Sequence, residues 1–257
     1  MDTPLFANLS ATTFVACCVV LFAAGFIRGF TGYGFGIAAV PLMGFLMPPD
    51  IVVPLVLLLQ ALVGLHGLGS ATTSCDIKSV FPIAIGAALA TMPGLALTFH
   101  LPPADLRLAI AIVASGSVTA LFAMRRTLPT AGQRGRSNSL LVGLLAGLAN
   151  GMAAMPGPPI VTYYLRAGLP AARMRANLVV CFALISAVSV VCTLAYDVRG
   201  LQPLVLTGVT APAVLLGSRA GTCAFHTALG RHFKLMSHLL LGMMALLAVL
   251  RSAADWL

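Results

Sequence analysis

The sequence predicts an all-α polytopic membrane protein built from two inverted repeats, and three observations lead to this prediction. Of the 257 residues, 60% are hydrophobic and only 8% are charged, whereas a soluble domain carries about 25% charged residues. Several apolar runs approach or exceed the roughly 20 residues that cross a bilayer. These runs also follow the same order twice, with a polar, basic stretch between the two halves.

Each predicted half contains one broken apolar segment followed by three full-length spans. In the first repeat, residues 1–123, segment 12–47 is broken near 28–36, and spans follow at about 50–68, 79–99 and 104–123. In the second repeat, residues 139–257, segment 139–165 is broken near 150–159, and spans follow at about 176–196, 203–221 and 234–250. The basic residues 124–138 between them form a linker.

A shift of 122 residues tests the internal repeat. It places Arg28 on Asn150, and in the same register it aligns three small residues with identical ones: Ala24, Gly25 and Gly29 with Ala146, Gly147 and Gly151. Each half crosses the membrane three times, an odd number, if its broken segment returns to the side of the membrane from which it entered. The two copies then have opposite orientations in the membrane. Inverted repeats of this kind are common among secondary transporters, which work by alternating access.

The distribution of basic residues favours this topology. Positive charge accumulates in cytoplasmic loops. With residues 124–138 in the cytoplasm and both broken segments folded as re-entrant hairpins, 11 Lys and Arg residues lie inside and three outside. If 139–165 crossed the membrane instead, the division would be seven to seven. The sequence therefore predicts two hairpins and a cytoplasmic linker.

The two breaks have the composition expected of an anion site. Irregular backbone is tolerated at membrane depth only where protein or a wet cavity satisfies it. Glycines permit the tight turn of the first break, and a proline-rich stretch serves the second. Each hairpin then directs the unpaired N–H groups of a half-helix toward mid-membrane, where they attract anions. The residues concerned are Gly29, Gly32, Gly34 and Gly36 in the first break and Pro156, Gly157, Pro158 and Pro159 in the second.

Arg28 is the candidate anion ligand. An arginine at mid-membrane costs roughly 2.5–3.5 kcal/mol, and no acidic residue lies near it in a chain that has no Glu. A bound oxyanion would supply the missing counter-charge, because a guanidinium holds oxyanions with two parallel hydrogen bonds. The alternative is that Arg28 reaches the membrane surface or donates to backbone carbonyls at the broken helix.

Other polar residues near the breaks have two interpretations each. The hydroxyls of Thr31 and Tyr33 could donate to the anion or to the local turn. The Asn150 amide could contact the anion or cap a half-helix. Arg175 and Asn177, at the start of the next span, are secondary candidates for the site or interfacial anchors.

Two stretches resemble the paired signatures of the TauE/SafE sulfite exporter family, also called the 4-toluene sulfonate uptake permeases. They are AGFIRGFTGYGFGIAAVPLM (24–43) and GLLAGLANGMAAMPGPPIVTYYLRAGLP (143–170), although MAAMPGPP stands where more glycines are expected. The resemblance implies a multi-pass carrier of the bacterial inner membrane for sulfite, sulfonates such as sulfoacetate, and related organic acids. It points to Arg28, Gly29, Thr31, Gly32, Tyr33 and Gly34, and to Asn150, Gly157, Pro158 and Pro159.

Three other functions are weighed against this one. TGYG (31–34) resembles the TVGYG filter of potassium channels, but Arg28 lies three residues upstream and the second copy lacks the motif. A carboxylate transporter stays open. An enzyme is not expected, because the spans contain no paired carboxylates, Ser–His pair or metal cluster. We expect no cofactor, metal or nucleic-acid partner. The expected partners are a small anion and membrane lipid, and a homodimer stays open.

Overall fold

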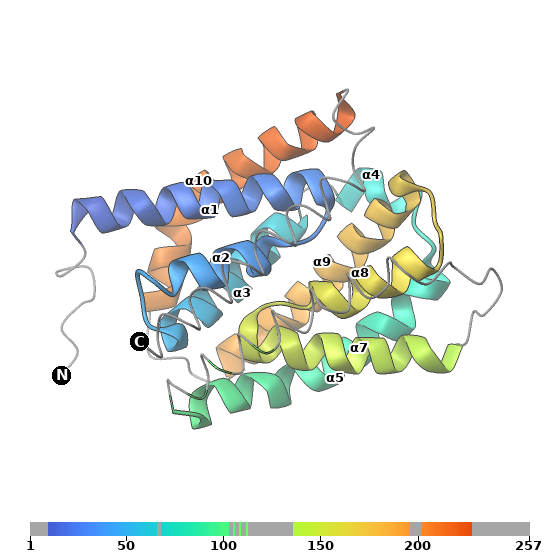
Figure 1. Ribbon diagram of the computed structural model, residues 1–257, viewed down its shortest axis with the longest axis horizontal. Helices are drawn as coiled ribbons and strands as arrows, with labels where there is room; N and C mark the ends of the chain where they lie inside the picture. Colours follow the sequence, from blue (N-terminus) through green and yellow to red (C-terminus); the bar gives the residue numbers. More distant parts are fainter. Residues whose placement is uncertain are drawn as a thin grey trace.

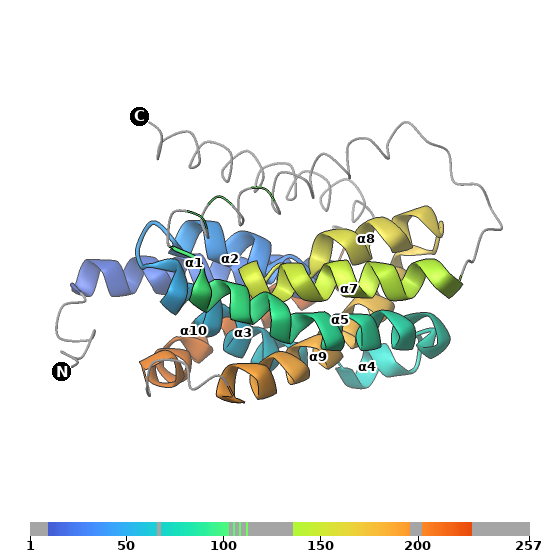
Figure 2. The same ribbon diagram turned by 90° about the horizontal axis from the view of Figure 1, so that it is seen from below.

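The computed structural model describes residues 10–65, 68–102, 105, 108, 112, 136–195 and 202–227, and within them every regular element is a helix (Figures 1 and 2). Four of these helices are long and apolar enough to cross a membrane, namely α1 (Ala11–Thr31), α5 (Ile77–His100), α9 (Ala171–Ala195) and α10 (Gln202–His226). Helices α3 (Pro49–Leu65) and α7 (Arg136–Ala153) are apolar but shorter. The fold agrees with the predicted all-α polytopic protein.

The predicted spans coincide with observed helices, with shifted ends. Span 50–68 corresponds to α3, 79–99 to α5, 176–196 to α9 and 203–221 to α10. A short helix, α4 (Leu68–Thr72), follows α3. The predicted span 234–250 lies outside the described residues, as do most of span 104–123 and of the linker 124–138.

Both broken segments are present, but the breaks are shorter than predicted. Helix α1 continues to Thr31 and α2 (Phe35–Met43) begins after three residues, while α7 continues to Ala153 and α8 (Gly157–Arg166) begins after three more. Arg28 and Asn150 are therefore helical, each in the last turn before its break. In both segments the second helix turns back alongside the first (Figure 1).

The conformation of the first break explains two of its glycines. Gly32 has φ 82° and ends α1, with its N–H donating to the Arg28 carbonyl at 2.8 Å. Gly34 has φ 88° and precedes α2. Side chains are disfavoured in this left-handed region. Ala154, 122 residues after Gly32, has φ 52° without being a glycine, so the second break forms a similar turn from MAAMPGPP at some cost in strain.

Helices pack mainly in two long pairs, α1 with α10 and α5 with α7 (Figures 1 and 2). Glycines bring the backbones into contact, as is usual between membrane helices. A Cβ at Gly25 or Gly29 of α1 would collide with carbonyl oxygens of α10. A Cβ at Gly143 or Gly147 of α7 would likewise collide with carbonyl oxygens of α5. Each pair thus joins one helix from each half of the chain.

Helix α3 lies at the centre of the bundle, and residues 51–60 are all buried. The outer face of α5 shows the opposite pattern, because large apolar side chains at helical spacing are exposed along it, namely Phe81, Ile85, Leu89 and Met92. In water such a stripe would be costly, whereas lipid tails cover it without loss. The bundle therefore has the outer surface of a membrane protein.

Element positions recur in the two halves. Helix α8 begins 122 residues after α2, and α9 begins 122 residues after α3. The packing recurs as well with the halves exchanged, since α1 of the first half packs on α10 of the second, and α7 of the second half packs on α5 of the first. These correspondences support the internal repeat.

Candidate functional site

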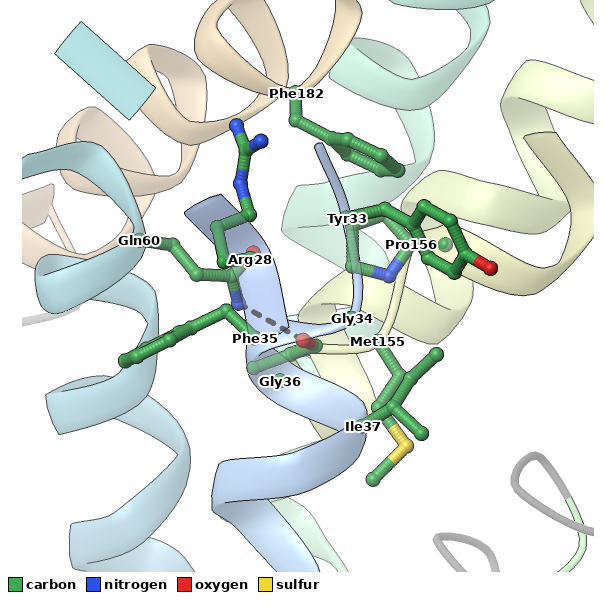
Figure 3. A pocket seen from close by; sticks show the side chains of 12 residues that line it. Arg28, Tyr33, Gly34, Phe35, Gly36, Ile37, Gln60, Met155, Pro156 and Phe182 are labelled. Atoms are coloured by element: carbon green, nitrogen blue, oxygen red, sulfur yellow. Dashed lines mark hydrogen bonds between the residues drawn. The ribbon is translucent and has the colours of Figure 1, made fainter. Parts of the chain in front are cut away.

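The two breaks lie against each other and enclose one pocket (Figure 3). At the contact, Gln60 of α3 donates from Nε2 to the Ala154 carbonyl oxygen at 2.8 Å. Gly36 of α2 lies so close to the same carbonyl that any Cβ would collide with it. The pocket has room for about one water molecule. Its lining comprises Arg28, Tyr33, Gly34, Phe35, Gly36, Ile37, Gln60, Ala154, Met155, Pro156, Gly157 and Phe182.

Two helix N-termini open onto this pocket. The first residues of α2, Phe35 to Ile37, and the first residue of α8, Gly157, belong to its lining. Neither helix has a side-chain cap. The N–H groups of a first helical turn lack partners within the helix and carry its positive dipole end. Pro158 and Pro159 have no N–H, so α2 contributes more donors than α8. Such helix ends are ready binding sites for an anion.

Arg28 adds a full positive charge to the pocket. Its side chain is 6% exposed, and its Cζ lies 5.6 Å from the centre of the Phe182 ring (Figure 3). Nη1 donates to the Gly32 carbonyl oxygen. Arg28 therefore makes the contact with a backbone carbonyl that was the alternative to anion binding. Nη2, however, is buried with no hydrogen-bond partner. One of the two terminal nitrogens of the guanidinium, Nη2, is therefore free to hold a ligand.

A comparison with protein families identifies the family of the chain. The family model described as sulfite exporter TauE/SafE matches residues 17–248. The chain belongs to the TauE/SafE sulfite exporter family. This confirms the resemblance seen in the sequence, and membership implies a multi-pass membrane transporter. Searches of curated proteins and of solved structures find no match to the chain.

Among the residues to which the TauE/SafE resemblance points, Arg28, Tyr33, Gly34 and Gly157 line the pocket. Tyr33 is 2% exposed. Gly32, the C-cap of α1, adjoins the pocket, and its carbonyl oxygen accepts a hydrogen bond from Arg28 Nη1. Pro158 and Pro159 lie in the first turn of α8 without lining the pocket.

Thr31 and Gly29 of the TauE/SafE signature stand outside the lining. The Thr31 hydroxyl lies 2.7 Å from the Ile27 carbonyl oxygen and 2.6 Å from that of Tyr33, and it accepts the Tyr33 N–H at 3.2 Å. It therefore stabilises the turn, which is the second of its two interpretations. Gly29 packs against the Ser218 backbone of α10.

Asn150 and Asn177 also lie away from the pocket. The Asn150 amide nitrogen is 2.7 Å from Ser189 Oγ of α9 and 3.4 Å from Thr91 Oγ1 of α5, so it joins three helices. Asn177 Oδ1 accepts the Asp76 N–H at 2.8 Å, at the start of α5. The other secondary candidate, Arg175, contacts the last turn of α1 instead.

The structure adds lining residues that the sequence reasoning missed, most notably Gln60, Met155 and Phe182. Gln60 carried a signal, because it is the only polar side chain in the run IVVPLVLLLQALVGL (51–65). Phe182 lies 122 residues after Gln60, so extending the repeat alignment into α3 would have found both positions.

Proposed function

We propose that the chain is a secondary transporter that binds a small oxyanion, sulfite or a sulfonate, between its two hairpin tips. The observation that carries this proposal is the buried, unpartnered Nη2 of Arg28 in a pocket with two uncapped helix N-termini. A charged donor without a partner is costly in a dry interior. An oxyanion offers it an acceptor and also accepts from the helix-end N–H groups.

Transport follows from how the tips close the pocket. The space holds about one water molecule, whereas sulfite has four heavy atoms, so the tips must separate to admit the anion. The contacts that must part are Gly36 against Ala154 and Gln60 to Ala154. Movement of one helical unit against the other around a central site is alternating access. Transport of this kind requires binding and release of the anion and no covalent chemistry, so we propose no enzymatic activity.

For the membrane arrangement we propose two inverted repeats, 1–123 and 139–257, with both hairpins re-entrant and 124–138 in the cytoplasm. The recurrence of element positions and the exchange of helix pairs support this arrangement. The excess of basic residues in the inside loops supports its orientation. A bacterial inner membrane is the location that we propose.

The backbone geometry argues against a potassium filter. Such a filter needs a row of free carbonyl oxygens to replace the ion's water. Here the Gly32 carbonyl accepts from Arg28 and the Tyr33 carbonyl is contacted by the Thr31 hydroxyl. Two of the four carbonyl oxygens of the TGYG stretch are thus engaged by side-chain donors.

The proposal is tested by flux into liposomes that contain the purified full-length protein. We expect uptake of labelled sulfite or of an alkanesulfonate that saturates with concentration, and no K⁺ flux above that of empty liposomes. K⁺ flux without anion uptake would overturn the proposal in favour of a channel. Saturable uptake of acetate with neither sulfur anion would favour the carboxylate alternative.

A further inference from the structure

The two half-helices that follow the breaks differ along one face. On α8, Pro159, Thr162 and Tyr163 share one side of the helix, and all three side chains are partly exposed. The residues 122 positions earlier, on α2, are apolar and buried, namely Ile37, Val40 and Pro41. The face is therefore apolar and closed on α2, whereas on α8 it is partly open and carries two hydroxyls.

Helix α8 has the length to join the pocket to a membrane surface. Gly157, its first residue, lines the pocket, and the helix ends at the exposed Arg166. Its 10 residues rise about 15 Å, which is half of the roughly 30 Å hydrocarbon core of a bilayer. The partly open face of α8 therefore reaches from the edge of the pocket to the end of the bundle at which α8 ends.

Contact with lipid does not account for this face. The outer side of α5 exposes large apolar side chains such as Leu89, whereas α8, which the structure describes in full, exposes none. Its partly exposed face carries the Thr162 and Tyr163 hydroxyls instead. Thr162 donates to the Pro159 carbonyl oxygen at 2.8 Å, but within the described part of the chain the Tyr163 hydroxyl has no hydrogen-bond partner. A hydroxyl without a partner favours contact with water or a hydrated ion over contact with lipid tails.

We propose that this face of α8 lines the path of the anion between the pocket and the side of the membrane at which α8 ends. The inference rests on the proposed function, because the path serves the anion that the pocket binds. When the tips separate, the anion moves along Pro159 and Thr162 to Tyr163, whose hydroxyl donates a hydrogen bond to it. The Tyr163 ring stands edge-on against the Tyr164 ring, with the ring centres 5.3 Å apart, so this donor is held in place.

The first test is labelling of single cysteines with an anionic methanethiosulfonate that does not cross membranes, in full-length protein whose six natural cysteines are replaced. The reagent is added from the side on which Arg166→Cys is labelled. It attacks the thiolate, which forms in water and not in lipid, so Thr162→Cys and Tyr163→Cys should react at least about tenfold faster than Leu89→Cys on α5. Val40→Cys, the counterpart of Thr162 on the closed face of α2, should react as slowly as Leu89→Cys. Complete modification of Thr162→Cys should also block uptake of sulfite into liposomes.

The second test is Tyr163→Phe, which keeps the ring and removes only the hydroxyl. Loss of one hydrogen bond to the moving anion should lower the maximal rate of sulfite uptake about twofold to tenfold. The melting temperature and the sulfite affinity measured by titration calorimetry should be unchanged, because Tyr163 does not line the pocket. A merely structural role of the hydroxyl would instead lower the melting temperature at an unchanged rate.

Two results would overturn the path along α8. One is labelling of Thr162→Cys and Tyr163→Cys as slow as that of Leu89→Cys, which would make this face a lipid contact. The other is full uptake after complete modification of Thr162→Cys, which would make the face a wet surface that the anion does not use. Labelling is measured without transport, so either failure is distinguishable from failure of the proposed function, which would be the absence of saturable anion uptake by the wild type.

Discussion

The guanidinium of Arg175 donates from Nη2 to the carbonyl oxygen of Gly29 over 2.6 Å, joining α9 to the last turn of α1. The Thr222 hydroxyl of α10 reaches the same oxygen at 3.3 Å, and Arg175 Cζ lies 4.4 Å from the centre of the Phe225 ring. Carbonyls at a helix C-terminus lack partners within the helix, and cations there are stabilising. The second half of the chain thus holds the helix end that carries Arg28.

Arg175→Ala should therefore destabilise the first tip without removing a ligand. A hydrogen bond to a charged group contributes about 1.5–3 kcal/mol, so we expect a lower melting temperature and a lower maximal transport rate. The KM for the anion should stay within about threefold, because Arg175 does not line the pocket. Arg173→Ala, exposed two residues earlier on α9, is the control. An unchanged melting temperature with a tenfold higher KM would make Arg175 a direct ligand, as the sequence had left open.

Gly36→Ala tests the contact between the two tips. The added Cβ would collide with the Ala154 carbonyl oxygen, a backbone atom that cannot rotate away. Overpacking of this kind costs about 1–3 kcal/mol, and the tips could not close, so transport should be lost. Gly208→Ala on α10 is the matched control, because a Cβ there meets nothing within 4 Å. Transport by Gly36→Ala at the rate of the control would show that the tips need not meet.

Gln60→Leu tests the hydrogen bond across the pocket. It removes the 2.8 Å bond to Ala154 and leaves a buried carbonyl unpaired, which costs about 1–3 kcal/mol. We expect a lower melting temperature in detergent and slower anion uptake. If both measurements matched the wild type, Gln60 would have no part in holding the tips together.

The membrane topology is tested by cysteine labelling from outside the cell, in a variant whose six natural cysteines are replaced. Arg134→Cys in the linker and Arg166→Cys at the end of α8 should both be protected, as expected of cytoplasmic positions. Pro102→Cys, which follows α5, should be labelled. Labelling of Arg166→Cys but not Arg134→Cys would mean that α7 and α8 cross the membrane instead of forming a re-entrant hairpin.

Periodicity and composition predicted the helices well, because long apolar runs leave little choice of structure in lipid. They could not place the break ends, since a helix continues until a residue adopts the left-handed conformation. In the first segment that residue is Gly32, one turn beyond Arg28. The sequence has four glycines near this break, and it does not show which of them adopts the left-handed conformation that ends the helix.

The repeat alignment predicted which positions are equivalent in the two halves better than it predicted the contacts of their side chains. Asn150 is the counterpart of Arg28, yet its shorter side chain donates to Ser189 within the bundle. Conversely, Phe182 was overlooked because a phenylalanine in an apolar span carries no signal of its own. Only its relation to Gln60, and the packing of α9 beside α3, bring it to the pocket.

The most direct test of the central claim is anion uptake by Arg28→Lys in liposomes, at matched protein content and melting temperature. The guanidinium gives one nitrogen to Gly32 and keeps another for the anion, whereas an ammonium has a single nitrogen and no planar fork. Arg166→Lys, at an exposed position, is the control. Binding of the anion by Arg28 predicts that uptake of sulfite and of propanesulfonate falls about tenfold or more in Arg28→Lys and is unchanged in Arg166→Lys. Wild-type uptake by Arg28→Lys would contradict it.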